Sequence, residues 1–193
     1  YVTAHSPDDE IRLQFVQALL RAGEIASAEQ SLDEIAVSTL LPGQLARFEY
    51  LAGVVAFGRG RYAQAVGQFQ RSLDAWEERR DPTTSLVSPD DARYYLGWAS
   101  YRSGQPREAL SALSSINPEN IRPELRFNAL YLESWVYYQL QEYDRTAQRL
   151  RTLLESTADV TRERRLRRLL ASAYVASEQM DQAREEYRRL ISL

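Results

Sequence analysis

The hydrophobic pattern of this chain fits pairs of short helices. Near the middle of the sequence, Leu96 and Gly97 lie on the apolar face of one helical segment, and Ala109 and Leu113 begin the apolar face of a second. Gly104 lies between the two segments, where it should end the first helix. Because helix axes approach closely only where side chains are small, we expect Gly97 and Ala109 to lie opposite each other.

The same pattern occurs five times along the chain. The small residues that follow each turn are Ala28, Ala65, Ala109, Thr146 and Ala183, at spacings of 37, 44, 37 and 37 residues. The small residues of the preceding helices follow the same spacings: Val16, Gly53, Gly97, Ser134 and Ala171. A period of this length is typical of repeat proteins. We therefore predict five units, each of one helix pair, over residues 9–193.

Start and stop signals set the expected boundaries. Ser6-Pro7-Asp8-Asp9 and Ser88-Pro89-Asp90-Asp91 each combine an N-cap serine, a proline at the first helical position and acids near the positive end of the helix dipole. We also predict helices over 24–37 and 44–58. Other helices are predicted to end at Arg80 and after Ile116. Later helices are predicted to start near Pro123 and at a cap on Thr161. The predicted organisation is an N-terminal lead (1–8), units one and two (9–80), a loop and candidate hinge (81–88), and units three to five (89–193).

Three of the units carry the same combination of small and aromatic residues. The matching residues are Leu96, Gly97, Gly104 and Ala109 in the third unit, Gly53, Gly60, Tyr62, Ala65 and Phe69 in the second, and Ala171, Tyr174, Ala183 and Tyr187 in the fifth. This combination resembles the tetratricopeptide repeat, whose usual period is about 34 residues. The resemblance implies a bacterial, all-α protein: a right-handed α-solenoid of about five helix-turn-helix repeats, with the first helices along its concave face.

The resemblance also implies which side chains face the concave groove. These are Tyr50 and Phe57 in the second unit, Tyr94, Trp98, Tyr101 and Arg102 in the third, Tyr131, Trp135 and Tyr138 in the fourth, and Arg165 and Arg168 in the fifth. Two interpretations of the aromatic residues stay open, because rings at helical spacing also pack in cores. Packing is the commoner role of such tyrosines, whereas Trp98 and Trp135 fit packing and partner binding equally well. Exposed rings of this kind are typical of binding hot spots.

Five arginines gather near the start of the last unit: Arg162, Arg164, Arg165, Arg167 and Arg168. One interpretation is a solvated helix face. The other is an anion-facing end of the groove that holds a carboxylate in bidentate fashion. The chaperone-tail clamp of this family needs lysine and asparagine at set groove positions, and the chain contains no lysine, so that ligand is disfavoured.

Composition excludes most catalytic chemistry. The chain has no cysteine and no lysine, and its one histidine, His5, lies in the N-terminal lead. Thiol and Schiff-base chemistry are thereby excluded, and a catalytic triad or a histidine metal site would depend on that single residue. No pair of carboxylates is placed at groove positions for hydrolysis. We therefore predict a protein that is not an enzyme, with no catalytic residues, metal site or cofactor.

Charge and hydropathy narrow the choice of partners. The net formal charge is −3 for the whole chain, and it changes from −4 over residues 1–60 to +2 over residues 121–193. A net-acidic chain with one short basic patch lacks the extended positive surface that nucleic-acid binding needs. No run approaches 18 consecutive apolar residues, so the sequence predicts no membrane-spanning helix.

The sequence therefore predicts a scaffold that binds an extended peptide or a partner helix in an aromatic groove, a role that fits cell-envelope assembly. The alternative is an accessory glycan-binding domain of a polysaccharide-handling enzyme or secretion system. Self-association through the apolar C-terminal edge at Leu190, Ile191 and Leu193 is also open. The first residue is Tyr1, which is expected of a processed form or a piece of a longer protein. A periplasmic or lipid-anchored location is favoured over a cytoplasmic one.

Overall fold

The structure is a computed structural model that describes residues 7–78 and 88–193. Within these ranges the chain forms ten α-helices and one short 3₁₀-helix, and it forms no strand. In chain order the elements are α1 (Pro7–Arg21), α2 (Ile25–Asp33), η1 (Val37–Thr39), α3 (Pro42–Gly58), α4 (Tyr62–Glu78), α5 (Pro89–Arg102), α6 (Pro106–Ser114), α7 (Pro123–Gln139), α8 (Tyr143–Glu155), α9 (Val160–Ala176) and α10 (Met180–Ser192). The predicted all-α fold is confirmed.

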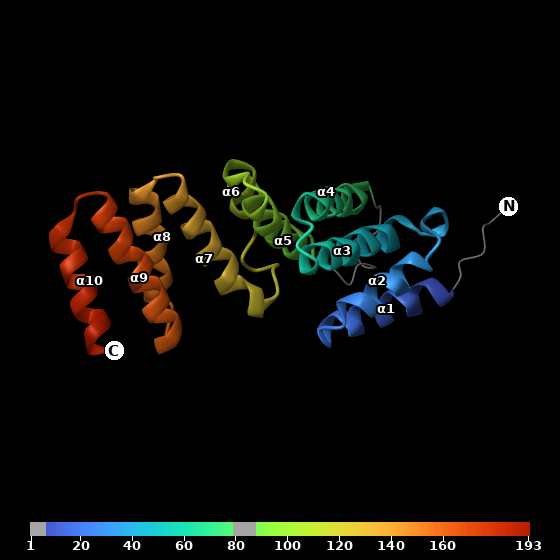
Figure 1. The fold of residues 1–193 in the computed structure, drawn as a ribbon, viewed down its shortest axis with the longest axis horizontal. Helices are drawn as coiled ribbons and strands as arrows, with labels where there is room; N and C mark the ends of the chain where they lie inside the picture. Colours follow the sequence, from blue (N-terminus) through green and yellow to red (C-terminus); the bar gives the residue numbers. More distant parts are fainter. Residues whose placement is uncertain (1–6, 79–87) are drawn as a thin grey trace.

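Successive α-helices pack as five pairs, from α1 with α2 to α9 with α10. Each first helix also packs against the second helix of the preceding pair, as α5 does against α4 and α9 against α8. Figure 1 shows the pairs side by side in one elongated row, with the N and C termini at opposite ends. The predicted α-solenoid of helix pairs is therefore confirmed.

The turn inside each unit contains one residue in the left-handed backbone region. In chain order, the first three units have Gly23, Gly60 and Gly104 at this position, and the last two have Gln141 and Glu178. Glycine adopts this conformation without steric conflict, as Gly104 does at a φ of 82°. Gln141 and Glu178 hold φ values of 63° and 62°, so the packing of the helix pair imposes the same turn where no glycine is present.

Two glycines lie where the helices of a unit approach closely. A Cβ atom built on Gly97 would lie 2.6 Å from Cγ of Leu113, and one built on Gly53 would lie 2.6 Å from the ring of Phe69. A side chain of the second helix therefore fills the space above each glycine. Leu113 lies one helical turn after Ala109 on the same face of α6, so the predicted face of α6 is the one that packs on Gly97.

Several predicted boundaries are also corrected. Helix α2 ends at Asp33, four residues before the predicted end at Val37, and the chain then forms η1. Helix α6 ends at Ser114, ahead of Ile116. The cap of α9 is Asp159 and not Thr161, because the Asp159 carboxylate accepts a hydrogen bond from the backbone N–H of Arg162 at 2.7 Å. The candidate hinge, except for Ser88, lies outside the described residues, as do the N-terminal lead up to residue 6 and Arg80.

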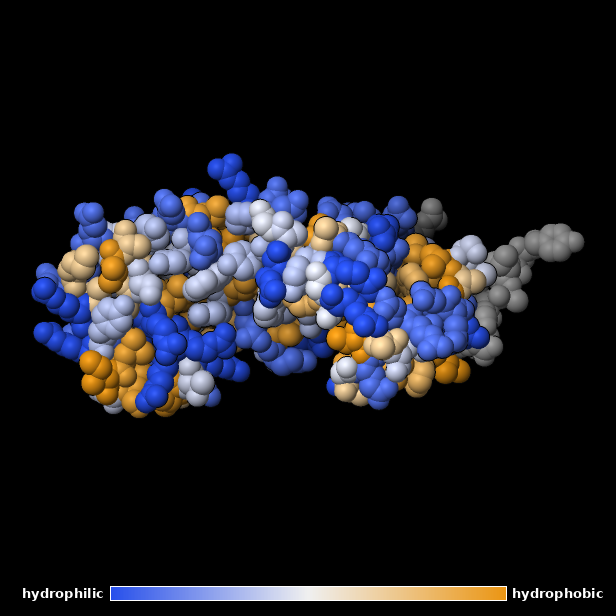
Figure 2. Space-filling model, in the orientation of Figure 1, coloured by the Kyte–Doolittle hydropathy of each residue, from blue (hydrophilic) through white to orange (hydrophobic). Residues whose placement is uncertain are grey.

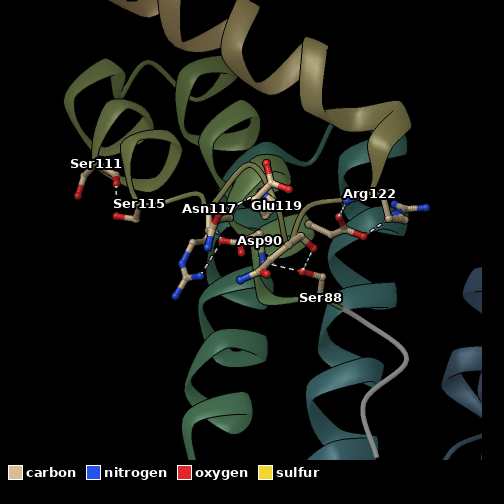
Figure 3. Close-up of polar contacts among 10 residues, drawn as sticks. Ser88, Asp90, Ser111, Ser115, Asn117, Glu119 and Arg122 are labelled. Atoms are coloured by element: carbon tan, nitrogen blue, oxygen red, sulfur yellow. Dashed lines mark hydrogen bonds and ion pairs between the residues drawn. The ribbon is translucent and has the colours of Figure 1, made fainter. Parts of the chain in front are cut away.

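Buried carboxylates at the start of α5 hold the connection between α6 and α7. Asp90 accepts a hydrogen bond from the backbone N–H of Asn117 (3.3 Å), and Asp91 accepts one from the N–H of Arg122 (3.1 Å). Asp91 also forms an ion pair with the guanidinium of Arg122. Ser88 caps α5 by accepting from the N–H of Asp90, and its hydroxyl donates to a carbonyl of the connection (Figure 3). The predicted start of α5 is confirmed, and its acids bind the next unit in addition to capping the helix.

Candidate binding groove

Aromatic side chains of α5 and α7 form a pocket between neighbouring units. The pocket has a volume of about 580 Å³, and its lining residues are Trp98, Tyr101, Arg102, Asn128, Tyr131, Leu132, Trp135 and Arg165. The first helices of three successive units contribute to it, as the sequence predicts for a groove. The rings of Trp98 and Trp135 are half-buried, so part of each ring reaches solvent.

A second pocket continues the first toward the C-terminal end of the row. It has a volume of about 360 Å³ and is lined by Tyr131, Trp135, Tyr138, Arg165, Arg168, Leu169 and Ser172. Tyr131, Trp135 and Arg165 line both pockets. The two pockets therefore form one continuous depression across α5, α7 and α9, which we call the aromatic groove.

The floor of the aromatic groove is held in place by contacts between units. The indole N–H of Trp135 on α7 donates a hydrogen bond to the hydroxyl of Tyr101 on α5, at 2.7 Å. The ring of Trp98 meets the ring of Phe57 on α3 edge to face, with centroids 5.7 Å apart. Each tryptophan thus has one side fixed by the protein and another open to a ligand, which limits the side-chain entropy lost on binding.

The rim of the aromatic groove carries arginines that lack acidic partners. Among the described residues, no carboxylate lies within ion-pair distance of Arg102, Arg165 or Arg168, and all three are exposed. The guanidinium of Arg165 lies 4.7 Å above the ring of Tyr131, and that of Arg102 lies 4.6 Å above the ring of Tyr62. Stacking on a ring leaves the N–H groups of a guanidinium free to bind a carboxylate.

The arginine run of the last unit has mixed roles. Arg167 is paired, because it bridges Glu163 and Glu186 at 2.7 Å each and so joins α9 to α10. Arg162 stacks on the ring of Phe127 at 4.7 Å. Only Arg165 and Arg168 line the aromatic groove. The run is therefore neither one solvated face nor one continuous anion site.

Two predicted groove residues are instead core residues. Tyr50 and Tyr94 are only 6% and 2% exposed, so neither ring is open to a partner. The hydroxyl of Tyr50 accepts a hydrogen bond from Arg122 at 3.2 Å, and its ring packs against that of Tyr95. Burial raises the pKa of both tyrosine hydroxyls well above the ordinary value. Phe57 is half-buried beneath Trp98 and lines neither pocket of the aromatic groove.

The structure adds Asn128 and Leu132 to the predicted residues of the aromatic groove. The Asn128 side chain makes no hydrogen bond with any described residue, so its amide is free to pair with a peptide backbone. Asn128 could have been found from the repeat spacing. Asn128 lies 37 residues before Arg165 and so holds the equivalent position in the preceding unit.

A separate pocket lies on the opposite side of α5. Its volume is about 450 Å³, and residues of α4, α5 and α6 line it, including Leu96 and Ser100. Leu96 and Ser100 lie on the helical face away from Trp98, so this pocket does not join the aromatic groove. No aromatic residue lines it.

The described residues offer neither a metal site nor a membrane-spanning helix. Over 7–78 and 88–193, no three or more histidine, cysteine or acidic side chains gather closely enough to hold a metal ion. In the same ranges, each helix is too short or too polar to cross a membrane.

Comparison with known proteins decides the family. The family model described as the tetratricopeptide repeat matches residues 13–82 and 50–117, which together span more than half of the chain. The chain belongs to the tetratricopeptide repeat family. No curated protein matches its sequence.

Solved structures of this family share the fold over nearly the whole chain. MamA 41-end from Desulfovibrio magneticus RS-1 is similar with a TM-score of 0.75 and 17% identity, over 98% of this chain and 97% of that one. MamA from AMB-1 has a TM-score of 0.74 and 13% identity, over 93% and 95%. YrrB, described as a TPR protein with an unusual peptide-binding site, has a TM-score of 0.72 and 19% identity, over 94% and 84%. At these identities the likeness shows the fold alone.

Proposed function

We propose that this tetratricopeptide repeat protein is a non-enzymatic scaffold that binds an extended, acidic peptide segment of a partner protein in the aromatic groove. Tetratricopeptide repeat proteins bind peptides or proteins, and YrrB of the same fold has a peptide-binding site. The observation that carries the proposal is that one depression combines half-buried tryptophans with arginines that form no ion pair with any described residue.

The lining of the aromatic groove offers contacts for three parts of such a peptide: an apolar side chain, the backbone and a carboxylate. An apolar side chain of the ligand packs between Trp98 and Trp135, where aromatic area provides most of the affinity. The free amide of Asn128 pairs with the peptide backbone. Arg165 forms a bidentate pair with a carboxylate of the ligand and so fixes the direction of the chain.

Glycan binding is a second candidate, because rings such as Trp98 and Trp135 also stack on sugars. The arginines favour the peptide proposal. A neutral glycan leaves the guanidiniums of Arg102, Arg165 and Arg168 without charged partners, whereas an acidic peptide satisfies them. A role in cell-envelope assembly stays a hypothesis drawn from the family.

The proposal can be tested with peptides selected from a randomised display library against the whole chain. Fluorescence anisotropy then measures the Kd of the tightest peptides for the parent, for Trp135→Ala and for Arg165→Gln. We expect acidic peptides with an apolar residue to be selected. Arg165→Gln should weaken them about tenfold, because a hydrogen bond to a charged group contributes about 1.5 kcal/mol.

Arg151→Gln is the matched control, since Arg151 is an exposed arginine of α8 that lies outside both pockets. Its Kd should equal that of the parent. If Arg151→Gln and Arg165→Gln weaken binding equally, the peptide is held by general charge and not in the aromatic groove. Selection of no peptide, together with binding of a neutral oligosaccharide that Trp135→Ala abolishes, would support the glycan proposal instead.

A further inference from the structure

The separate pocket beside α5 lies where the two following units place a tyrosine ring. Ser100 of α5 lines this pocket, and the equivalent residues, one and two repeats later, are Tyr137 of α7 and Tyr174 of α9. Tyr174 packs in one core cluster with Ala147 of α8 and Ala183 of α10. A ring at this position therefore fills space between the second helices of two neighbouring units.

The contacts of Tyr137 show which part of the second helix such a ring meets. The guanidinium of Arg145 on α8 lies 5.7 Å from the centroid of the Tyr137 ring. The residue equivalent to Arg145 in the third unit is Glu108 of α6, which also lines the separate pocket. The short side chain of Ser100 leaves the place of the ring open. The pocket of about 450 Å³ between α4, α5 and α6 includes that place.

The lining of the separate pocket combines apolar side chains with a polar rim. Val66, Leu73 and Leu96 are half-buried, whereas Gln105 and Glu108 are exposed. Figure 2 shows that hydrophilic residues predominate on the visible face over α4, α5 and α6, with hydrophobic residues between them. The volume lies in the range of roughly 300–1,000 Å³ that is typical of ligand sites. A ring with one polar end matches such a lining.

The hydroxyl of Ser100 gives the separate pocket a specific polar group. Ser100 is only 1% exposed, and its hydroxyl makes no hydrogen bond with any residue that the structure describes. A hydroxyl that loses most of its water without gaining a partner lowers stability, so a ligand that pairs with it gains affinity. A serine hydroxyl both donates and accepts, and it can pair with the hydroxyl of a phenol ring.

We propose that the separate pocket binds a tyrosine side chain of a partner protein. The ring takes the place that Tyr137 and Tyr174 take in their own units, and its hydroxyl pairs with Ser100. The amides of Gln70 and Gln105 lie on the exposed rim, where they can pair with a peptide backbone. These amides favour a residue of a polypeptide over a free phenol. The proposal does not depend on the aromatic groove or its ligand, because the two sites lie on opposite sides of α5.

Titration of the isotope-labelled whole chain with N-acetyltyrosinamide, followed by NMR, tests the proposal. We expect saturable shifts of backbone amides around Leu96, Ser100 and Ala112, with a Kd on the order of 1 mM for so small a probe. N-acetylphenylalaninamide lacks the hydroxyl and should bind about fivefold more weakly. In Ser100→Ala the two probes should bind equally, because the partner of the phenol hydroxyl is gone.

Two variants should abolish the saturable shifts by filling the separate pocket. Ser100→Tyr places a ring where two other units carry one, so we expect this variant to keep the fold. Ser111→Trp covers the pocket from the exposed rim of α6 and does not alter its buried residues. Circular dichroism confirms that each variant keeps its helices.

Two control variants should bind N-acetyltyrosinamide like the parent. Ser114→Trp adds the same ring to α6 at an exposed residue that does not line the separate pocket. Trp135→Ala alters the aromatic groove alone. A weaker Kd in Trp135→Ala would place the probe in the aromatic groove and so overturn the proposal.

Three further results would also overturn the proposal. The parent could show no saturable shifts around the separate pocket. Ser100→Tyr and Ser111→Trp could both fold and bind the probe like the parent, which would place the ring elsewhere. The chain could bind p-cresol, the free ring of tyrosine, but not N-acetyltyrosinamide, in which case the ligand is a small phenol and not a residue of a protein.

Discussion

Tyr50 of α3 and Tyr131 of α7 hold equivalent positions in the repeat, yet their surroundings differ. Tyr50 is buried, whereas Tyr131 is half-exposed and lines both pockets of the aromatic groove. Arg122 reaches Tyr50 from the connection between α6 and α7, and Asp91 holds that arginine in place. Tyr131 contacts the guanidinium of Arg165 and the ring of Phe127, and part of its side chain stays exposed.

The repeat determines the direction of these side chains but not their exposure. The position in the repeat sets the direction in which a side chain points. Contacts from later parts of the chain determine whether that side chain is buried or exposed. In the first half of the row the facing aromatic residues pack in the core, and in the second half they line the aromatic groove.

The largest expected effect comes from removing the rings of Tyr50 and Tyr131. Tyr50→Ala should lower the free energy of unfolding by about 3–5 kcal/mol, because it removes a buried aromatic ring. Tyr131→Ala should lower it by less than about 2 kcal/mol, since part of that ring already contacts solvent. Urea denaturation followed by circular dichroism measures both. Equal losses would mean that Tyr131 is a core residue like Tyr50.

A smaller effect is expected from two glycines of the second unit. Gly53→Ala should destabilise the fold by about 1–3 kcal/mol, because the new methyl group would meet the ring of Phe69. Gly67→Ala should stabilise it by about 1 kcal/mol, since the methyl group meets only the end of Arg71 and alanine favours the helix. Thermal melts of both variants test this. If the Gly53→Ala variant is as stable as the parent, α3 and α4 are less tightly packed at Phe69 than the structure indicates.

The smallest effect concerns Glu133, which lies buried on α7 behind the aromatic groove and pairs with Arg149 at 3.1 Å. Burial raises the pKa of Glu133 above its ordinary value of 4.5, and the nearby arginine only partly offsets this. Between the ordinary and the raised pKa, the folded state binds more protons than the unfolded state, so this group lowers stability as the pH rises through that window.

Glu133→Gln should therefore gain stability relative to the parent as the pH rises through that window, and the gain should be absent below it. Urea denaturation at a series of pH values measures the difference. A variant whose deficit grows with pH would show that the pair with Arg149 outweighs the burial of the carboxylate. Leu132→Met, a neighbouring change without charge, should leave the pH dependence of the parent unchanged.

Much of the fold and part of the candidate site follow from the sequence alone. The spacings of small residues predict the five helix pairs, and the turns at Gly23, Gly60 and Gly104 follow from glycine itself. The same spacings place Trp98 and Trp135 in one groove, as the structure does, although binding there stays a prediction.

The remaining features depend on contacts between distant parts of the chain. The burial of Tyr50 requires Arg122, which lies 72 residues away and enters from a connection with no repeat signal. The close contact of Leu113 with Gly97 was not predicted, because the exact rotation of one helix on another is not encoded in a spacing. Asn128 could have been found, since its position matches that of Arg165, but polar residues carry little weight in a pattern of apolar ones.

The most direct test of binding in the aromatic groove is to map where a ligand lies. The tightest selected peptide is made with a photo-crosslinking side chain, irradiated with the whole chain, and its attachment sites are located by mass spectrometry. We expect adducts on α5, α7 and α9, at residues that line the aromatic groove such as Trp98, Tyr131 and Arg168. Adducts on α4 and α6, around the separate pocket on the opposite side of α5, would contradict it.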